Sequence, residues 1–117
     1  MSDDSLIRLR DALRDFAAER DWQQFHTPKN LAMALSGEAG ELIEHFQWLT
    51  PEQSDALTEA QREAVALEMA DVLMYLVRLA DVLDIDLQAA AERKLAINAE
   101  RYPAERARGT AAKYDQL

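Results

Sequence analysis

Residues 63–78, EAVALEMADVLMYLVR, form the most apolar helix that the sequence predicts. Between its two ends the only charged residues are Glu68 and Asp71, and apolar side chains occupy all faces of the helix. A helix that is apolar all round is buried on all sides. A monomeric bundle of four helices of this size would leave part of it in water, so we expect a second subunit to cover it.

Helical periodicity continues on both sides of this stretch, and no strand-like alternation persists. Thr27-Pro28 is a strong helix start, and Thr58-Glu59-Ala60-Gln61 is typical of a capping box. Because Pro103 biases the residue before it away from the helix, we expect the tail from Ala104 to be irregular. The sequence therefore predicts an all-α fold, a four-helix bundle completed by dimerisation, as a single domain over 1–117. We predict its helices over about 5–20, 28–48, 59–83 and 87–101.

Composition limits the classes of protein that remain. The 117 residues contain no cysteine, which excludes a disulfide scaffold, a thiolate zinc site and a cysteine nucleophile. The net charge of −9 argues against a general binder of nucleic acid or of an anionic membrane. The acidic start at residues 1–4 lacks the pattern of a signal peptide, and no run of about 18 apolar residues is long enough to span a bilayer. We expect a cytoplasmic protein.

Each of the two central helices carries an acidic pair at its apolar stripe. Glu38 falls inside the stripe of the second helix with Glu41 at its edge, and Glu68 falls inside that of the third with Asp71 beside it. Buried carboxylates are costly unless they are paired, protonated or bound to a metal. One such pair is ordinarily exposed to solvent, but two pairs within apolar stripes favour a cation site. Oxygen ligands suit Mg²⁺, and a phosphorylated substrate would complete its octahedron.

The acidic segments also resemble a known family. GEAGELIE at 37–44 followed by EMAD at 68–71 resembles the paired ExxE…ExxD signature of the MazG-like nucleotide pyrophosphohydrolases. The segments FAAERDW at 16–22, QFH at 24–26, FQW at 46–48 and residues 94–103 closely resemble the dCTP pyrophosphatase branch. The resemblance spans about residues 9–117. It implies an all-α homo-oligomer built on tight dimers, with a tetramer favoured in this branch.

The same resemblance implies an activity and a ligand set. It implies Mg²⁺-dependent cleavage of a nucleoside triphosphate, with dCTP or a modified dCTP expected first, to monophosphate and pyrophosphate. The positions that match the metal ligands of the family are Glu38, Glu41, Glu68 and Asp71. Either Glu38 or Glu41 is a candidate general base for the attacking water, and the sequence does not choose between them.

Two further groups of residues are candidates for binding the nucleotide. Matching positions in the dCTP branch implicate Trp22, His26, Trp48 and Tyr75 around the base. Taken singly, such aromatic residues are more often part of a core, but His26 lies in a predicted loop. Lys94, Asn98 and Arg101 share one face of the last predicted helix and can hold phosphate or sugar oxygens. The alternative for this face is a solvated surface with two basic residues.

Two other interpretations compete with a pyrophosphohydrolase. A di-iron bundle needs Glu-x-x-His on two helices, and neither His26 nor His45 has a glutamate three residues before it. A non-catalytic helical interaction module would use the acids only to cap helices or solvate an interface. It predicts neither stabilisation by metal nor hydrolysis, so one assay separates it from an enzyme.

Overall fold

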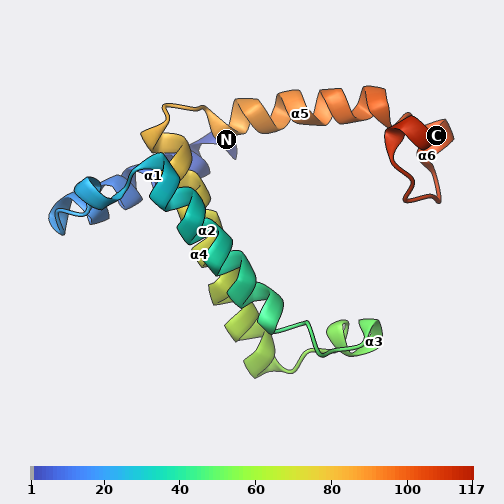
Figure 1. The fold of residues 1–117 in the computed structure, drawn as a ribbon, viewed down its shortest axis with the longest axis horizontal. Coiled ribbons are helices and arrows are strands. Elements are labelled where there is room, and N and C mark those ends of the chain that lie inside the picture. Colours follow the sequence, from blue (N-terminus) through green and yellow to red (C-terminus); the bar gives the residue numbers. More distant parts are fainter. Residues whose placement is uncertain (1) are drawn as a thin grey trace. The chain divides into compact units, whose positions relative to one another are not determined.

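The computed structural model describes residues 2–117, and its regular secondary structure is entirely helical over that range (Figure 1). This confirms the predicted all-α class. None of the helices searched in this range has the length and hydrophobicity that crossing a bilayer requires. The longer helices are α1 (Ser2–Glu19), α2 (Pro28–Glu44), α4 (Glu59–Val82) and α5 (Leu87–Arg101). The shorter elements are α3 (Pro51–Ser54), α6 (Ala104–Ala107) and the 3₁₀ turns η1 (Gln23–Phe25) and η2 (Tyr114–Gln116).

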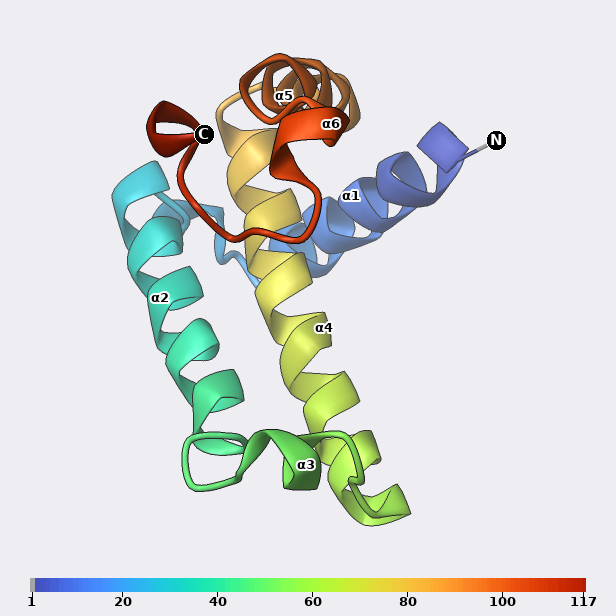
Figure 2. The ribbon, with the colours of Figure 1, turned by 90° about the vertical axis from the view of Figure 1, so that its right-hand side faces the viewer.

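The chain forms two compact units, one that ends at Ile85 and one over Asp86–Leu117. In the first unit, α2 and α4 run antiparallel and side by side, and α1 packs against α4 (Figures 1 and 2). The second unit contains α5, α6 and η2. The single domain, the place of the last helix in one bundle and the completion of that bundle by dimerisation stay predictions. The buried apolar residues are Ala17, Leu31, Val65, Val77 and Ala80.

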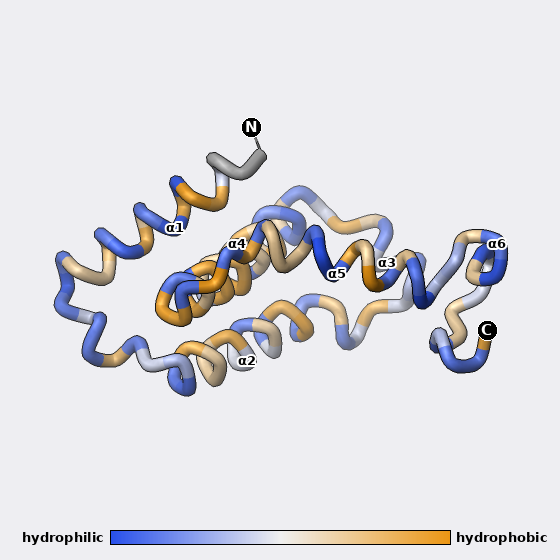
Figure 3. The backbone as a smooth tube through the Cα atoms, turned by 90° about the horizontal axis from the view of Figure 1, so that it is seen from above, coloured by the Kyte–Doolittle hydropathy of each residue, from blue (hydrophilic) through white to orange (hydrophobic). Residues whose placement is uncertain are grey.

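Helix α4 is apolar along most of its turns, whereas hydrophobic and hydrophilic residues alternate along α1 (Figure 3). Part of this apolar surface lies outside the small core. Met69, Leu73 and Leu76 are 56, 42 and 36% exposed. Their spacing of four and three residues places them on one face of the helix. We call this face the α4 apolar stripe.

Three of the four predicted helix starts are confirmed by their caps, whereas α1 begins at Ser2 rather than at about residue 5. The Thr27 side chain accepts a hydrogen bond from the backbone N–H of Asn30, and Pro28 follows as the first helical residue. Thr58 and Gln61 form both bonds of the capping box. The Asp86 carboxylate accepts from the backbone N–H of Ala89.

The predicted end of the second helix at Trp48 is wrong, because α2 ends at Glu44. Beyond this point the backbone tightens into turns: the N–H of Phe46 bonds the carbonyl of Ile43 at 2.9 Å, three residues back. A new helix start follows these turns. Thr50-Pro51 repeats the pattern of Thr27-Pro28, and Thr50 forms a capping box with Gln53 that begins α3. The residue before a proline avoids helical angles, so α2 does not continue through Thr50.

Helices α1 and α4 both end in Schellman turns whose left-handed residue is an aspartate, Asp21 at φ 54° and Asp84 at φ 55°. In the first turn, the N–H of Trp22 bonds the carbonyl of Ala17 at 2.9 Å, and the N–H of Asp21 bonds that of Ala18 at 3.1 Å. These are the two bonds of the motif, which usually has glycine at the left-handed position. The turn at Asp84 repeats both bonds.

The tail is more ordered than predicted. Pro103 places its carbonyl to accept from the N–H groups of Arg106 and Ala107, at 3.0 and 2.8 Å, and so starts α6. In the same unit the Tyr114 ring meets Tyr102 edge-on with ring centroids 6.1 Å apart. The guanidinium carbon of Arg101 lies 4.8 Å from the centre of the Tyr114 ring. These aromatic contacts fold the tail onto the end of α5.

Candidate metal centre and adjoining pocket

Acidic side chains from α2 and α4 converge in the first unit. One carboxylate oxygen from each of Glu38, Glu41 and Glu68 lies within 4.8 Å of the others. The Glu38 carboxyl also hydrogen-bonds both Glu41 and Asp71. The antiparallel contact of α2 with α4 therefore brings together all four acidic residues that the sequence singled out, and we call them the carboxylate cluster.

Crowding of like charges changes the protonation of this cluster. A hydrogen bond to Glu41, burial, and then a hydrogen bond to Asp71 raise the pKa of Glu38 to about 7. A carboxyl that keeps its proton near neutral pH can donate a hydrogen bond to a neighbouring carboxylate, which relieves the repulsion. Acidic groups crowded in this way are typical of residues that together hold a cation.

The cluster also fits a divalent cation by its donor set. Glu68 Oε2 is buried and has no hydrogen-bond partner among the described residues. A buried carboxylate oxygen without a partner is costly, and a bound cation would satisfy it. The ligand atoms are all oxygens, which suit a hard divalent ion. A non-catalytic interface offers no such explanation for this oxygen.

A pocket of about 150 Å³ lies between α1, the η1 segment and α4. Trp22, His26 and Tyr75, three of the four predicted base-binding residues, contribute to its wall. The Trp22 ring meets the rings of Phe16 and His26 edge-on, with centroids 5.7 and 6.3 Å apart. The full lining is Leu13, Phe16, Ala17, Trp22, His26, Asp71, Met74, Tyr75 and Arg78.

Asp71 belongs to both features, because it lines the pocket and hydrogen-bonds Glu38 of the carboxylate cluster. An apolar and aromatic pocket thus opens beside a set of oxygen ligands. A molecule with a flat ring and an anionic group can use both at once.

Trp48 is not brought to this pocket within the chain. It lies in the turns after α2 and is 84% exposed, because the helix that was predicted to carry it ends four residues earlier. Lys94, Asn98 and Arg101 lie on α5 in the second unit, where Lys94 and Arg101 are exposed and Arg101 stacks on Tyr114. The roles of these four residues stay predictions.

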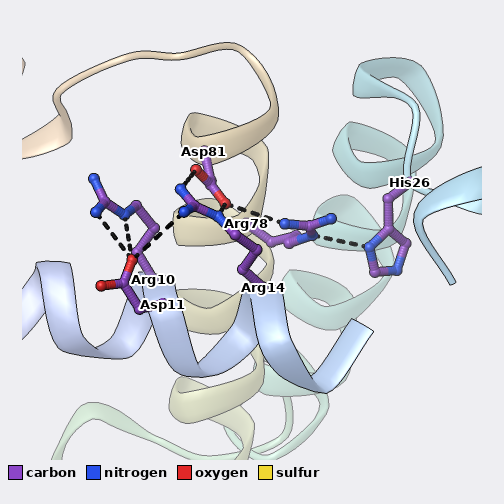
Figure 4. A network of polar contacts seen from close by, with 6 residues as sticks. All are labelled: Arg10, Asp11, Arg14, His26, Arg78 and Asp81. Carbon is purple, nitrogen blue, oxygen red and sulfur yellow. Dashed lines mark hydrogen bonds and ion pairs between the residues drawn. The ribbon is translucent and has the colours of Figure 1, made fainter. Parts of the chain in front are cut away.

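Sequence reasoning missed a polar network that lies against the pocket (Figure 4). Arg78 is only 8% exposed, and its Nε donates to His26 Nδ1 at 3.0 Å while its Nη1 donates to Asp81 Oδ2 at 3.1 Å. Arg14 of α1 completes the network with two hydrogen bonds to Asp81. The available signal was Arg78 itself, a base at the end of the apolar stretch 63–78 and three residues before an acid.

Comparison with known proteins agrees with this geometry. Residues 33–117 match the model of the MazG-like family. The chain belongs to this family. Human dCTP pyrophosphatase 1 is 48% identical over 115 residues, which cover 97% of this MazG-like chain and 68% of the human protein. The bovine protein of the same name is 46% identical over 118 residues, which cover 99% of this chain and 70% of the relative.

A solved structure extends the likeness to three dimensions. The crystal structure of a pyrophosphatase from Archaeoglobus fulgidus has a TM-score of 0.80 and 41% identity to this MazG-like chain, and covers 85% of it and 93% of the archaeal chain. The MazG-like match begins at residue 33, so it contains the whole carboxylate cluster. Trp22 and His26 precede it and fall in the part of the chain that the dCTP pyrophosphatase alignments cover.

Proposed function

We propose that this MazG-like chain cleaves dCTP, or a dCTP modified at C5, to the monophosphate and pyrophosphate with Mg²⁺ held by the carboxylate cluster. The chain is an enzyme of the nucleoside triphosphate diphosphatase class, in keeping with its family and its identity to the dCTP pyrophosphatases. The observation that carries the proposal is the position of Asp71, which lines the aromatic pocket and also hydrogen-bonds Glu38 of the carboxylate cluster. A nucleotide has the matching parts, a flat base and an anionic phosphate chain.

The carboxylates and the pocket have separate tasks in this proposal. Bound Mg²⁺ would neutralise the phosphate oxygens and lower the pKa of a bound water. Glu38, Glu41, Glu68 and Asp71 would hold the ion. Glu38 or Glu41 would accept the proton of the attacking water.

The base would lie between Trp22 and Tyr75, whose rings can stack on any base. Selection among bases needs a polar group at the base edge, since an unpaired buried donor or acceptor rejects the wrong ligand. His26 is the polar candidate in the pocket wall. Lys94, Asn98 and Arg101 are proposed to hold phosphate or sugar oxygens, as their residue types and common helix face allow.

We further propose a homodimer or homotetramer, with the tetramer favoured by the likeness to the dCTP branch, acting in the cytoplasm on free nucleotides. The exposed α4 apolar stripe supports association, since large exposed apolar patches are typical of interaction surfaces. Nucleic acids and membranes are not expected partners, because the chain has a net charge of −9.

The test is pyrophosphate release from dCTP, dTTP, dUTP and dATP, each with Mg²⁺ and with EDTA. We expect Mg²⁺-dependent release, with dCTP giving the highest kcat/KM. Glu68→Gln should lose most of the activity, whereas the control Glu63→Gln, an exposed acid on the same helix, should keep it. Release from no nucleotide would favour the non-catalytic interaction module. A profile led by dATP would refute the pocket assignment and leave the metal site standing.

A further inference from the structure

His26 is held from two sides by residues of the first unit. Arg78 donates its Nε–H to His26 Nδ1 at 3.0 Å (Figure 4). The Trp22 ring meets the imidazole edge-on, with ring centroids 6.3 Å apart. Arg78 is itself fixed, because its Nη1 bonds Asp81 and Asp81 bonds Arg14 twice. The imidazole therefore has a defined plane in the pocket wall.

Because Arg78 is the donor of this hydrogen bond, it determines which nitrogen of the His26 ring carries the proton. A guanidinium has only donors, so Nδ1 of His26 must be the acceptor and cannot carry a proton. In a neutral imidazole the proton then lies on Nε2. Burial first, and the positive charge of Arg78 second, lower the pKa of His26 and so keep the ring neutral.

We propose that Arg78 is a positioning residue that fixes His26 as a hydrogen-bond donor at Nε2, so that the pocket selects ligands with an acceptor at the facing edge. The selection of a base rests on the proposed function. Among pyrimidines, cytosine has two adjacent acceptors, O2 and N3, whereas N3 of thymine or uracil carries a hydrogen. A fixed N–H donor can therefore hydrogen-bond N3 of cytosine. In thymine and uracil it would face the N3–H group, which is also a donor.

The tautomer can be measured on the protein without any nucleotide. Nitrogen-15 NMR of the imidazole side chains distinguishes a protonated ring nitrogen from a bare one, and Gln substitution of each histidine assigns the two rings. We expect the bare nitrogen of His26 to be Nδ1 at neutral pH. Arg78→Met should shift the His26 nitrogens toward a mixed population while leaving His45 unchanged, and Arg78→Lys should restore part of the wild-type pattern. Protonated Nδ1 in the wild type, or an unchanged His26 spectrum in Arg78→Met, would overturn the proposal.

A double-mutant cycle tests whether Arg78 acts through His26. The measured quantity is the ratio of kcat/KM for dCTP to that for dTTP. Arg78→Met should lower this ratio about tenfold, the size of one net hydrogen bond. In the His26→Ala background the same change should leave the ratio unaltered, and Arg62→Met, an exposed control on α4, should have no effect in either background. Equal losses in both backgrounds would overturn the positioning role.

Failure of the proposed function gives a different result. A chain that hydrolyses neither nucleotide would refute that function and with it the selection of a base. The NMR spectrum would still decide whether Arg78 sets the tautomer. If Arg78→Met does not fold, the tautomer is read from the spectra of the wild type and Arg78→Lys. The ratio of kcat/KM is then measured with Arg78→Lys in place of Arg78→Met.

Discussion

Arg14 of α1 and Asp81 of α4 form a bidentate ion pair, with Nη2 2.6 Å from Oδ1 and Nε 3.0 Å from Oδ2. The Arg14 side chain is 51% exposed and that of Asp81 only 11%. The hydrogen bond from Arg14 is the main reason that the pKa of Asp81 lies below its ordinary value. Asp81 also neutralises the buried Arg78. Loss of Asp81 would therefore leave a buried charge without a counter-ion, whereas loss of Arg14 would not.

Asp81→Asn should destabilise the fold by about 3 kcal/mol, because it leaves Arg78 charged and buried without its counter-ion. Arg14→Met should cost much less, because Asp81 keeps its ion pair with Arg78 and about half of the Arg14 side chain is in water. Urea unfolding of both variants beside the wild type measures the difference. If both variants lost the same free energy of unfolding, the burial of Arg78 would not be the reason that Asp81 matters for stability.

Without metal, the stability should fall as the pH rises from 4.5 to about 7 through the titration of Glu38. Its pKa in the folded chain is about 7, against an ordinary value of 4.5 for a glutamate. A raised pKa means that the folded state binds the proton more tightly, so the contribution is complete below pH 4.5 and lost above pH 7. Asp81 and His26, whose pKa values are lowered, act in the opposite direction.

The comparison that isolates Glu38 is wild type against Glu38→Gln, by urea unfolding in EDTA at pH 5.5 and 8. The variant should gain stability relative to the wild type at pH 8 and not at pH 5.5. Mg²⁺ should raise the melting temperature of the wild type more at pH 8 than at pH 5.5, because the ion competes with the proton. An identical pH dependence in the two proteins would contradict the raised pKa.

Gly37 lies within α2 with open space where a Cβ would be, so Gly37→Ala should stabilise the chain by about 0.5–1 kcal/mol. Gly109 is the matched control. It also has open space, but its φ of 77° is left-handed, and Ala there should destabilise by about 1 kcal/mol. Thermal unfolding measures both. A lower melting temperature for Gly37→Ala would show that a second molecule approaches this turn.

Sedimentation at micromolar concentration should show at least a dimer, because the α4 apolar stripe would otherwise face water. Leu73→Glu places a charge in the middle of this stripe and should dissociate the assembly. Arg62→Glu changes the charge at an exposed position of the same helix and should leave it intact. A folded wild-type monomer would refute association through α4.

Features that depend on neighbours in sequence were predictable, and features that depend on packing were not. The caps at Thr27, Thr58 and Asp86 involve residues three apart, so their pattern is visible in the chain. The same pattern at Thr50 to Gln53 was equally visible, but it does not by itself indicate that α2 ends as early as Glu44 and leaves Trp48 outside the helix.

The candidate site also has one feature that the sequence could predict and one that depends on packing. The carboxylate cluster could be predicted because each acid lies at an apolar stripe, where an unpaired charge needs an explanation. The bond from Arg78 to His26 joins residues 52 apart. It depends on how the segment after α1 folds back against α4, and no local pattern of residues encodes that distance.

The left-handed turn at Asp21 has a consequence for how this pocket can change during evolution. Trp22 follows the turn directly, and the backbone bonds to Ala17 and Ala18 that fix its position do not depend on any side chain in the pocket. A mutation that replaces the Trp22 side chain therefore leaves these main-chain bonds in place. A new ligand preference can arise there by a single substitution, while the turn that supports it stays the same.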